Sequence, residues 1–363
     1  MSFESILSDL TGIPKAISDC LNFYISDGKK KLENVRLWIR NSTVNRVVFI
    51  GHSYNYFASS VPFRYLNSRI QNEAEEFRKE CVIYEIDEFI SYYNPQHNNQ
   101  ELHSDTLFVF VSRSGESLQI KLGIKKLKEY INPENIWSVT DKPDSYLAKV
   151  SHFSFPMKSG HEEVMGSKSY LNTLLVLYLL ARSLMGKEAI PENREEEIRN
   201  LIFEMKFYSD DWESNTKKVS DFLGKDFNFL YFISTGASMA TASQSALACK
   251  AYARTHGEAI SLGLFLHGPF QIIDDSFRCV IISGDKSNID NVLRLIDMIT
   301  NKLGHGKVIL INNNQQLSTL GRNNANVFVF EHTTENTYLA PIFEYLVIQY
   351  LFFKKALERG VIE

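Results

Sequence analysis

The feature that most constrains the fold is a pattern that occurs twice along the chain. In each copy, a run of β-branched and aromatic residues passes through a turn of small residues into a helical segment. The first copy is VVFIGHSYNYFASS, and the second is LYFISTGASMATAS. We align Gly51 with Gly236 and Ser53 with Ser238. Such a repeat predicts an internal duplication, and hence two domains built on one plan.

Strand-like runs alternate with helical periodicity in both halves, which is typical of βαβ units on a parallel sheet. Strands are predicted at 46–50, 81–86, 107–111 and 135–139, and again at 229–233, 279–283, 307–312 and 327–330. The fold class is therefore α/β, with two doubly wound, flavodoxin-like domains in tandem, each with three α-β-α layers. We expect N-terminal helices and the first domain at 1–188, a helical connector at 189–224, and the second domain at 225–363.

Composition narrows the functional classes. The 363 residues carry a net charge of −4 and no large block of Lys or Arg, which argues against a nucleic-acid partner. No signal-like apolar segment follows Met1, and the most apolar helix, at 171–185, is too short to cross a bilayer. The 4 cysteines are scattered among apolar residues and are predicted to be reduced core thiols. We therefore expect a cytoplasmic protein without a membrane partner.

The segment FVFVSRSGESL, from Phe108 to Leu118, gives the strongest chemical signal. A predicted strand ends in the hydroxyl-rich turn from Ser112 to Ser117, and a helical pattern follows at once. A helix N-terminus has unpaired N–H groups and a positive dipole end, and three serine hydroxyls add donors. No lysine follows the glycine, so a single terminal phosphate suits this turn better than a nucleoside triphosphate. An ordinary strand–helix turn with serine N-caps is equally compatible with these residues.

Three motifs in a fixed order resemble the SIS (sugar isomerase) family. GHSY, from Gly51, resembles its G-[ST]-S-Y turn; SRSGES, from Ser112, resembles its S-x-S-G-E-[ST] phosphate loop. GLFLHGP, from Gly263, resembles G-E-x-x-H-G-P without the glutamate. The likeness covers nearly the whole chain and is greatest to the isomerase half of glucosamine–fructose-6-phosphate synthases, and to related deglycases and aminosugar-phosphate deaminases. It implies tandem SIS domains and a hexose 6-phosphate ligand, or an amino or fructosamine derivative, with no cofactor.

The resemblance also implies a set of binding residues. They are Ser112, Ser114 and Ser117 at the phosphate, and Gly51, His52 and Ser53 beside the sugar. His52 stands where the family has a small hydroxyl residue, which changes the sugar contacts. Two roles stay open: Arg113 pairs with the phosphate or is a surface cation, and Ser167 contacts sugar hydroxyls or caps the helix near Tyr170.

The sequence supplies fewer of the catalytic groups than of the binding groups. Aldose–ketose isomerisation moves a proton between C1 and C2, so it needs a base and an acid that opens the sugar ring. His267 is the candidate acid, because imidazole titrates near neutral pH; its alternative is a satisfied core histidine. By the resemblance, the family's catalytic glutamate falls on Ala251. Glu258 is the replacement candidate, with His256 and Glu163 behind it, and each is also compatible with a structural role.

Two functions therefore stay open. The retained loops favour a phosphosugar isomerase, deglycase or deaminase, whereas Ala251 and the short tail favour a non-catalytic phosphosugar sensor. The family implies a homodimer whose site is shared across the interface. Ser2 takes the place of the family's glutaminase cysteine, so glutamine-dependent amidotransfer is not expected. The 9 histidines are too dispersed to predict a metal site.

Overall fold

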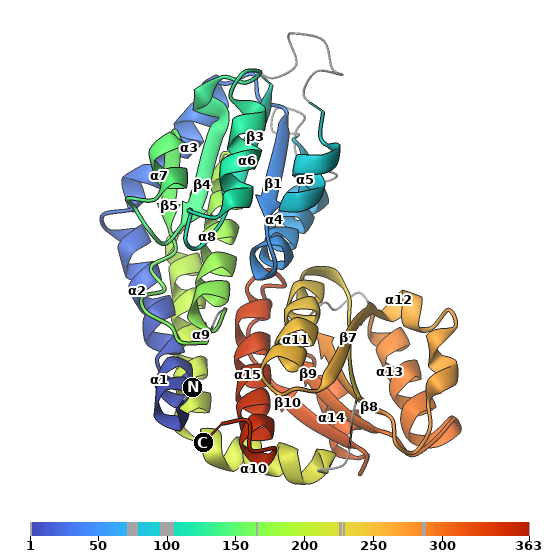
Figure 1. Ribbon diagram of the computed structural model, residues 1–363. Coiled ribbons are helices and arrows are strands. Elements are labelled where there is room, and N and C mark those ends of the chain that lie inside the picture. Colours follow the sequence, from blue (N-terminus) through green and yellow to red (C-terminus); the bar gives the residue numbers. More distant parts are fainter. Residues whose placement is uncertain are drawn as a thin grey trace. The chain divides into compact units, whose positions relative to one another are not determined.

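Apolar runs of four to six residues form two separate five-stranded sheets, each entirely parallel (Figure 1). The computed structural model describes residues 2–70, 79–94, 105–164, 166–224, 227, 229–284 and 288–362. It divides into a first unit, Lys15–Ile198, and a second unit that joins Met1–Pro14 to Arg199–Glu363. The helix α9 (Glu192–Asp210) runs from the first unit into the second.

The sheet of the first unit is covered on both faces. Its strands, in the order β2-β1-β3-β4-β5, are β1 (Arg46–Gly51), β2 (Glu80–Glu85), β3 (Thr106–Val111), β4 (Ile136–Thr140) and β5 (Phe153–Pro156). Its helices are α2 (Ile13–Ile25), α3 (Lys29–Asn41), α4 (Tyr54–Ile70), α5 (Ile86–Tyr92), α6 (Leu118–Leu127), α7 (Tyr146–Val150) and α8 (Lys168–Leu184). The helices α5, α6 and α7 pack on the face that carries Phe108 and Phe110, and α4 and α8 lie on the other. Because β3 has helices on both sides, all six of its residues are buried, and all except Thr106 are apolar.

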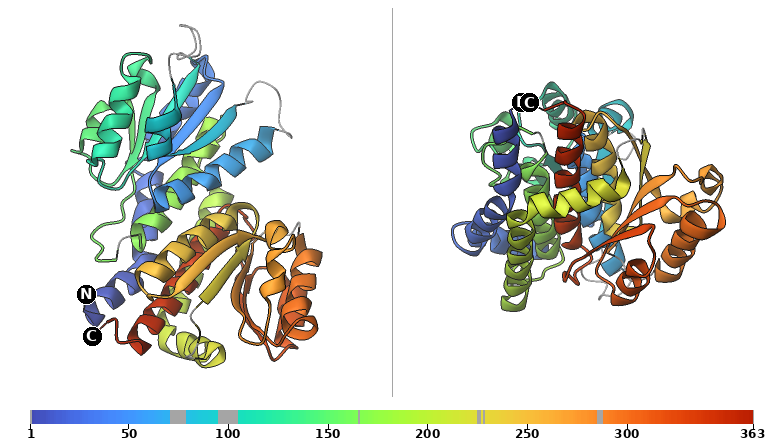
Figure 2. Two further views of the ribbon diagram at one scale, coloured as in Figure 1. Left: turned by 45° about the vertical axis from the view of Figure 1, so that its right-hand side comes forward. Right: turned by 90° about the horizontal axis from the view of Figure 1, so that it is seen from below.

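The second unit repeats this plan (Figure 2). Its strands, in the order β10-β9-β8-β6-β7, are β6 (Phe229–Ser234), β7 (His256–Ser261), β8 (Arg278–Ser283), β9 (Lys307–Asn312) and β10 (Val327–Glu331). Its further helices are α1 (Phe3–Thr11), α10 (Trp212–Leu223), α11 (Met239–Ala251), α12 (Leu262–Phe265), α13 (Ile289–Asp297), α14 (Gln315–Arg322) and α15 (Ala340–Glu358). The helices α12, α13 and α14 cover the face of Ile281 and Leu310, and α11 and α15 lie on the other. The predicted α/β class, with three layers in each unit, is confirmed.

Both sheets have the same strand order when each is numbered from its own first strand, as the predicted duplication requires. Ser53 and Ser238 are correctly aligned, because each directly precedes the helix that follows the first strand. The alignment of Gly51 with Gly236 is wrong. Gly51 ends β1, whereas β6 ends at Ser234 and Gly236 begins an additional 3-10 turn. The second turn is therefore longer by two residues.

Two strands were not predicted, β5 and β7, and both lie at a sheet edge. β7 has the sequence HGEAIS, in which only Gly257 and Ile260 are buried. Neither strand has a continuous apolar run, because β7 begins with His256, Gly257 and Glu258, and β5 is a four-residue strand that ends in Pro156. The boundaries at 1–188, 189–224 and 225–363 stay a prediction. We note only that α1 belongs to the second unit, where the Phe3 and Phe353 ring centroids lie 5.4 Å apart.

The cysteines are buried and form no disulfide, as expected for core thiols: Cys20, Cys81, Cys249 and Cys279. Burial raises the pKa of the Cys249 thiol to about 12. Among the helices of the described residues, none combines the length and apolar character that a membrane span requires.

A buried carboxyl group lies beside the turn that repeats the first unit's turn. Glu344, in α15, is fully buried; Ser238 donates a 2.8 Å hydrogen bond to its Oε1, and Oε2 has no hydrogen-bond partner among the described residues. Burial raises the pKa of Glu344 from its ordinary 4.5 to about 8, because the charged form loses its hydration. Because the pKa of Glu344 is higher in the folded chain than in the unfolded chain, its contribution to the free energy of unfolding is fully present below pH 4.5. That contribution is lost as the pH rises through about 8.

We predict that Glu344→Gln raises the free energy of unfolding at neutral pH by up to about 3 kcal/mol. At this pH the Glu344 carboxyl group is ionised in the unfolded chain and must take up a proton on folding, which costs free energy. The amide of glutamine does not titrate and avoids this cost. Urea denaturation across this pH window measures the effect. The difference from the wild type should grow as the pH rises. Glu213→Gln, at an exposed position of α10, should show no such growth. A pH-independent difference for Glu344→Gln would contradict the prediction.

Candidate functional site

The first unit has a cavity of about 1080 Å³ beyond the carboxyl ends of β1, β3 and β4. Ligands of doubly wound sheets bind at this edge. Six of the predicted binding residues line the cavity: His52, Ser53, Ser112, Arg113, Ser114 and Ser117. Lys142 and Lys158 also line it and were not singled out from the sequence. Lys142 could have been found from the sequence, because it comes two residues after the end of β4, where ligand-binding residues of such sheets lie.

The hydroxyl groups of the serine turn accept local amide hydrogens. Ser112 accepts from Gly115 at 3.2 Å, Ser114 from Glu116 at 3.4 Å, and Ser117 from Ile120 at 3.3 Å. Ser117 is thus the N-cap of α6, as one of the two interpretations held. A hydroxyl that accepts a hydrogen bond still has its own proton to donate, so capping does not prevent these groups from binding an anion.

Glycine is required at two points beside the cavity. A Cβ atom at Gly51 would lie 2.7 Å from the backbone of Asn55, so only glycine lets β1 turn this tightly into α4. Gly115 has a φ of 63°, in the left-handed region, and packs against Ser145. Ser53 adopts a φ of 56° without being glycine, which marks a constrained position in the wall.

Glu116 does not line the cavity and instead ties the turn to α7. Its carboxylate accepts a 2.6 Å hydrogen bond from the amide of Tyr146 and lies 3.0 Å from Nζ of Lys121. The bonds to Lys121 and to the Tyr146 amide hold the pKa of Glu116 below its ordinary value. Its role is therefore to fix the turn.

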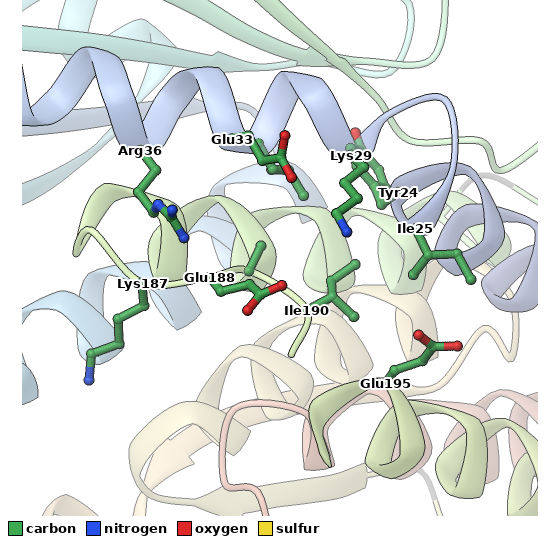
Figure 3. Close-up of a pocket in the computed structure, with 11 residues that line it drawn as sticks. Tyr24, Ile25, Lys29, Glu33, Arg36, Lys187, Glu188, Ile190 and Glu195 are labelled. Carbon is green, nitrogen blue, oxygen red and sulfur yellow. The ribbon is translucent and has the colours of Figure 1, made fainter. Parts of the chain in front are cut away.

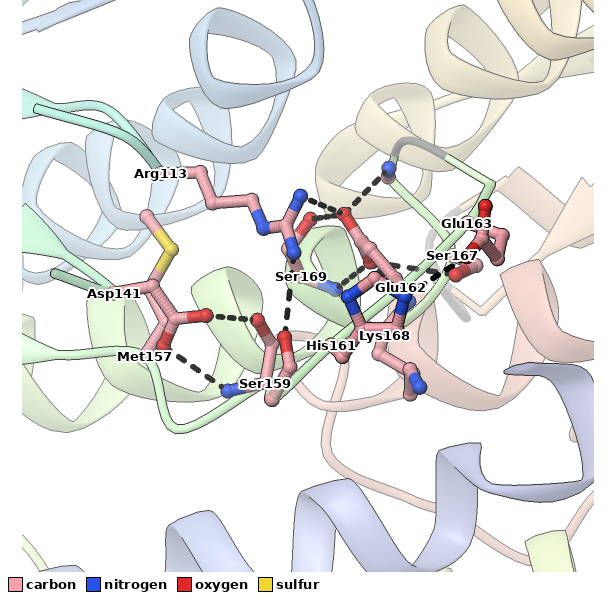
Figure 4. Close-up of polar contacts among 12 residues, drawn as sticks. Arg113, Asp141, Met157, Ser159, His161, Glu162, Glu163, Ser167, Lys168 and Ser169 are labelled. Atoms are coloured by element: carbon pink, nitrogen blue, oxygen red, sulfur yellow. Dashed lines mark hydrogen bonds and ion pairs between the residues drawn. The ribbon is translucent and has the colours of Figure 1, made fainter. Parts of the chain in front are cut away.

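Arg113 is already paired inside the protein (Figure 4). Its guanidinium lies 3.3 Å from the Glu162 carboxylate and donates a 3.3 Å hydrogen bond to the carbonyl of Gly160. The side chain of Glu162 is 0% exposed, so this cation compensates a buried charge. Arg113 is therefore not a free surface cation, and Glu162 is a central residue that sequence reasoning missed.

Glu162 also caps the N-terminus of α8. Its Oε2 accepts the amide hydrogens of Lys168, at 2.9 Å, and Ser169, at 2.8 Å, and its Oε1 accepts from the amide of Gly166, at 3.1 Å. Ser169 adds a hydroxyl hydrogen bond of 2.6 Å. Negative charge is favoured at a helix N-terminus, and here one carboxylate satisfies three backbone donors.

Ser167 is fully buried and does not line the cavity. It stands at the N-cap position of α8 but makes no capping hydrogen bond; its hydroxyl lies 3.3 Å from Oε2 of Glu162. The capping role that one interpretation gave to Ser167 belongs to Glu162.

His52 pairs with a carboxylate from the neighbouring strand. Its Nδ1 lies 2.5 Å from Oε1 of Glu85, which ends β2. With Asp87 these two residues form a group whose potential metal-ligand atoms all lie within 4.8 Å of one another. Exposed acidic groups are common without an ion, and the hydrogen bond itself explains the closeness of His52 and Glu85.

The predicted catalytic residues lie in the second unit. His267 follows α12 and is exposed, so the alternative of a core histidine is wrong. Glu258 is exposed on the edge strand β7, where it neighbours Tyr231 of β6 and contributes to the raised pKa of that phenol, behind burial. Ala251 ends α11 and is exposed. The serine turn, by contrast, belongs to the first unit.

A second cavity, of about 270 Å³, lies in the first unit beside α3 and the segment after α8 (Figure 3). Charges of both signs line it: Lys29, Arg36 and Lys187 against Glu33, Glu188 and Glu195. No motif falls there, and its mixed charge offers a phosphate no net attraction.

We predict that Glu162→Gln lowers the free energy of unfolding by about 3 kcal/mol, because it leaves Arg113 without its counter-charge in a buried site. Urea denaturation at constant pH measures the change. The adjacent Glu163, whose side chain is 48% exposed beside His161, is the matched control, and Glu163→Gln should shift the value by less than about 0.5 kcal/mol. Equal effects of the two variants would show that the Glu162 network does not stabilise the fold.

Comparison with known proteins finds one matching domain and several similar chains. Residues 85–183 match the model of the SIS domain. A glutamine–fructose-6-phosphate aminotransferase (isomerizing) of Sulfurisphaera tokodaii is 26% identical over 280 residues, which are 77% of this chain and 43% of that protein. The chain spans about half the length of the curated relatives it matches, with 43%, 48% and 55% of three of them covered.

Solved structures show the same fold over nearly the whole chain. The C-terminal domain of glucosamine-fructose-6-phosphate aminotransferase from Francisella tularensis has a TM-score of 0.77 at 19% identity and covers 98% of this chain and 96% of that one. Glucosamine-6-phosphate deaminase from Thermotoga maritima has a TM-score of 0.68 at 19% identity and covers 98% and 95%. The resemblance carried by the three motifs is thus confirmed, since residues 85–183 match the SIS domain.

Proposed function

We propose that the protein binds a hexose 6-phosphate, or an amino or fructosamine derivative of one, with the phosphate at Ser112, Ser114 and Ser117. The observation that supports this most directly is that the serine turn borders an open cavity. Had local side chains filled that space, an oxyanion could not approach the hydroxyls. Gly51 then shapes the wall, while His52 and Ser53 lie beside the sugar.

The electrostatics of the cavity suit a phosphate group. Three hydroxyl donors and the N-terminus of α6 meet at the turn, and Lys142 adds an exposed ammonium group. Two of the cavity's acids are engaged elsewhere: Glu162 in its network, and Asp141 with the amide and hydroxyl of Ser159. Their charge is therefore partly compensated before a dianion arrives.

We further propose that the protein is an enzyme: a phosphosugar isomerase, deglycase or aminosugar-phosphate deaminase without glutaminase activity. Relatives and neighbours of this fold include an isomerizing aminotransferase and a deaminase that act on sugar phosphates. His267 would open the sugar ring. Leu264 and Ile272 flank it and are 59% and 47% exposed, which supports a homodimer that covers this loop and shares the site. A cytoplasmic location fits such a metabolic role.

One observation favours a second candidate, a non-catalytic phosphosugar sensor. Ala251 has no group that could take a proton, and Leu264 replaces the glutamate of the His-Gly-Pro motif. Glu258, the replacement considered from the sequence, is paired along the strand edge with Tyr231. A sensor would bind the same ligands and leave them unchanged.

We predict that Ser114→Ala weakens binding of glucose 6-phosphate by about 10- to 100-fold, the loss expected for one hydrogen bond to a charged group. Isothermal titration calorimetry measures the affinity. Ser91→Ala, at an exposed position of α5, is the matched control and should bind like the wild type. Unphosphorylated glucose should bind neither protein measurably. If no hexose 6-phosphate, glucosamine 6-phosphate or fructosamine 6-phosphate binds the wild type, the proposed ligand class is wrong.

We predict that the wild type transforms one member of this phosphosugar panel, and that His267→Ala lowers the rate by about 100-fold with little change in affinity, as expected for loss of an acid–base group. Proton NMR in D₂O follows both product and deuterium entry at C1 and C2. His305→Ala, an exposed histidine of the second unit, should keep the full rate. Binding of a phosphosugar with no reaction and no exchange would favour the sensor.

A further inference from the structure

The proposed reaction needs a base, and the residue at the family's position cannot serve. Ala251 ends in a methyl group, so the proton between C1 and C2 must be carried by another side chain. A base must reach the sugar, and the cavity of the serine turn is where the proposed phosphate lies. The candidates are therefore the ionisable groups that line this cavity.

The carboxylates of the cavity are already committed. Glu162 is fully buried and satisfies Arg113 and the start of α8. Asp141 accepts hydrogen bonds from the amide and the hydroxyl of Ser159. Asp19 lies 2.5 Å from Nζ of Lys15 on the same helix. A proton taken from carbon would therefore compete with contacts that these carboxylates already make.

His52 differs from these carboxylates in how it is held. It follows Gly51, which lies beside Glu85 in the parallel pairing of β1 and β2. Nδ1 of His52 lies 2.5 Å from Oε1 of Glu85, and Oε2 of Glu85 accepts the amide hydrogen of Asp87 at 2.7 Å. The carboxylate is therefore held at both oxygens, on the ends of two adjacent strands, which is a rigid support for a reacting group.

The position of His52 suits a ligand anchored at the serine turn. Gly51 is paired with Val111 of β3, so His52 and Ser112 follow neighbouring strand ends, about 4.8 Å apart as adjacent strands are. The imidazole lines the cavity and is 61% exposed, whereas the Glu85 side chain is 26% exposed and does not line it. A sugar phosphate bound at Ser112 would thus meet the imidazole first and the carboxylate behind it.

We propose that His52 is the base of this enzyme and that Glu85 positions it. This inference rests on the proposed function. With the Nδ1 hydrogen donated to Glu85, Nε2 has a free electron pair, and the carboxylate stabilises the imidazolium that forms. Nε2 takes the proton from the hydroxyl-bearing carbon next to the carbonyl group; the C–H electron pair forms a C=C bond, and the carbonyl π pair moves to its oxygen, which takes up the proton of the neighbouring hydroxyl group. The imidazolium then returns its proton to the former carbonyl carbon, where the C=C pair forms the new C–H bond. The oxyanion on the other carbon re-forms a C=O bond, so the carbonyl group has moved by one position.

A second histidine of the cavity, His161, is the alternative base. His161 also lines the cavity and lies 2.9 Å from Glu163, but its side chain is 82% exposed and its partner is only two residues away in the same loop. His52 instead joins two strands of the sheet. Preorganisation therefore favours His52 over His161.

The experiment measures deuterium exchange at C1 or C2 of the phosphosugar that the wild type transforms, together with its affinity. His52→Ala should lower the exchange rate by about 100-fold or more and change the affinity by less than about threefold. Added imidazole should restore part of the rate, because the missing side chain leaves an open position in the cavity wall. His152→Ala, an exposed histidine outside the cavity, should exchange at the wild-type rate.

Glu85→Gln tests the positioning role. It should lower kcat by about tenfold while KM stays constant, it should not respond to imidazole, and Glu85→Asp should recover part of the rate. The assays contain a chelator, and a loss of wild-type exchange in its presence would overturn the proposal. So would full exchange by His52→Ala, a defect in His161→Ala alone, or a loss of affinity in His52→Ala that matches the loss of rate. Failure of the wild type to bind any phosphosugar would refute the proposed function instead.

Discussion

A buried carboxylate fixes the geometry of the cavity. Removing the charge of Glu162 from water costs several kcal/mol, and the structure compensates this with Arg113, with three backbone amides and with Ser169. Arg113 stands between Ser112 and Ser114, so its pairing holds the serine turn to the start of α8. Because few arrangements of these segments satisfy all of the donors at once, the network specifies one shape for the cavity wall.

The duplicated plan is used in two ways. In the first unit, the turn after the first strand opens on a large cavity lined by Ser53. In the second unit, the corresponding Ser238 donates to the buried Glu344, whose Oε1 also limits the space beside Gly284. The same strand order therefore supports a candidate ligand site in one unit and an internal hydrogen bond in the other. A fold does not assign a function to each of its copies; the side chains at the strand ends do.

The departures from the SIS motifs that the chain resembles leave the serine turn intact. The serine turn matches its motif at every position, whereas by the resemblance Ala251 and Leu264 fall where the motifs have acidic residues. The imidazole at position 52 is itself a departure, and the fold gives it a carboxylate partner from the next strand. A parallel sheet makes such a replacement possible, because its carboxyl edge brings the ends of several strands to one cavity.

The sequence by itself determined the two-unit α/β architecture, eight strands and the position of the serine turn, because continuous apolar runs and small-residue turns are local signals. It could not identify β5 and β7, which lack such runs. Nor could it identify Glu162, which stands beside Glu163 with nothing in the local pattern to distinguish a buried carboxylate from an exposed one. Only the tertiary structure decided that Arg113 is paired internally and that His52 meets Glu85, since both contacts join residues that are 49 and 33 positions apart. Contacts between distant segments follow from how strands and loops pack, and no local pattern encodes them.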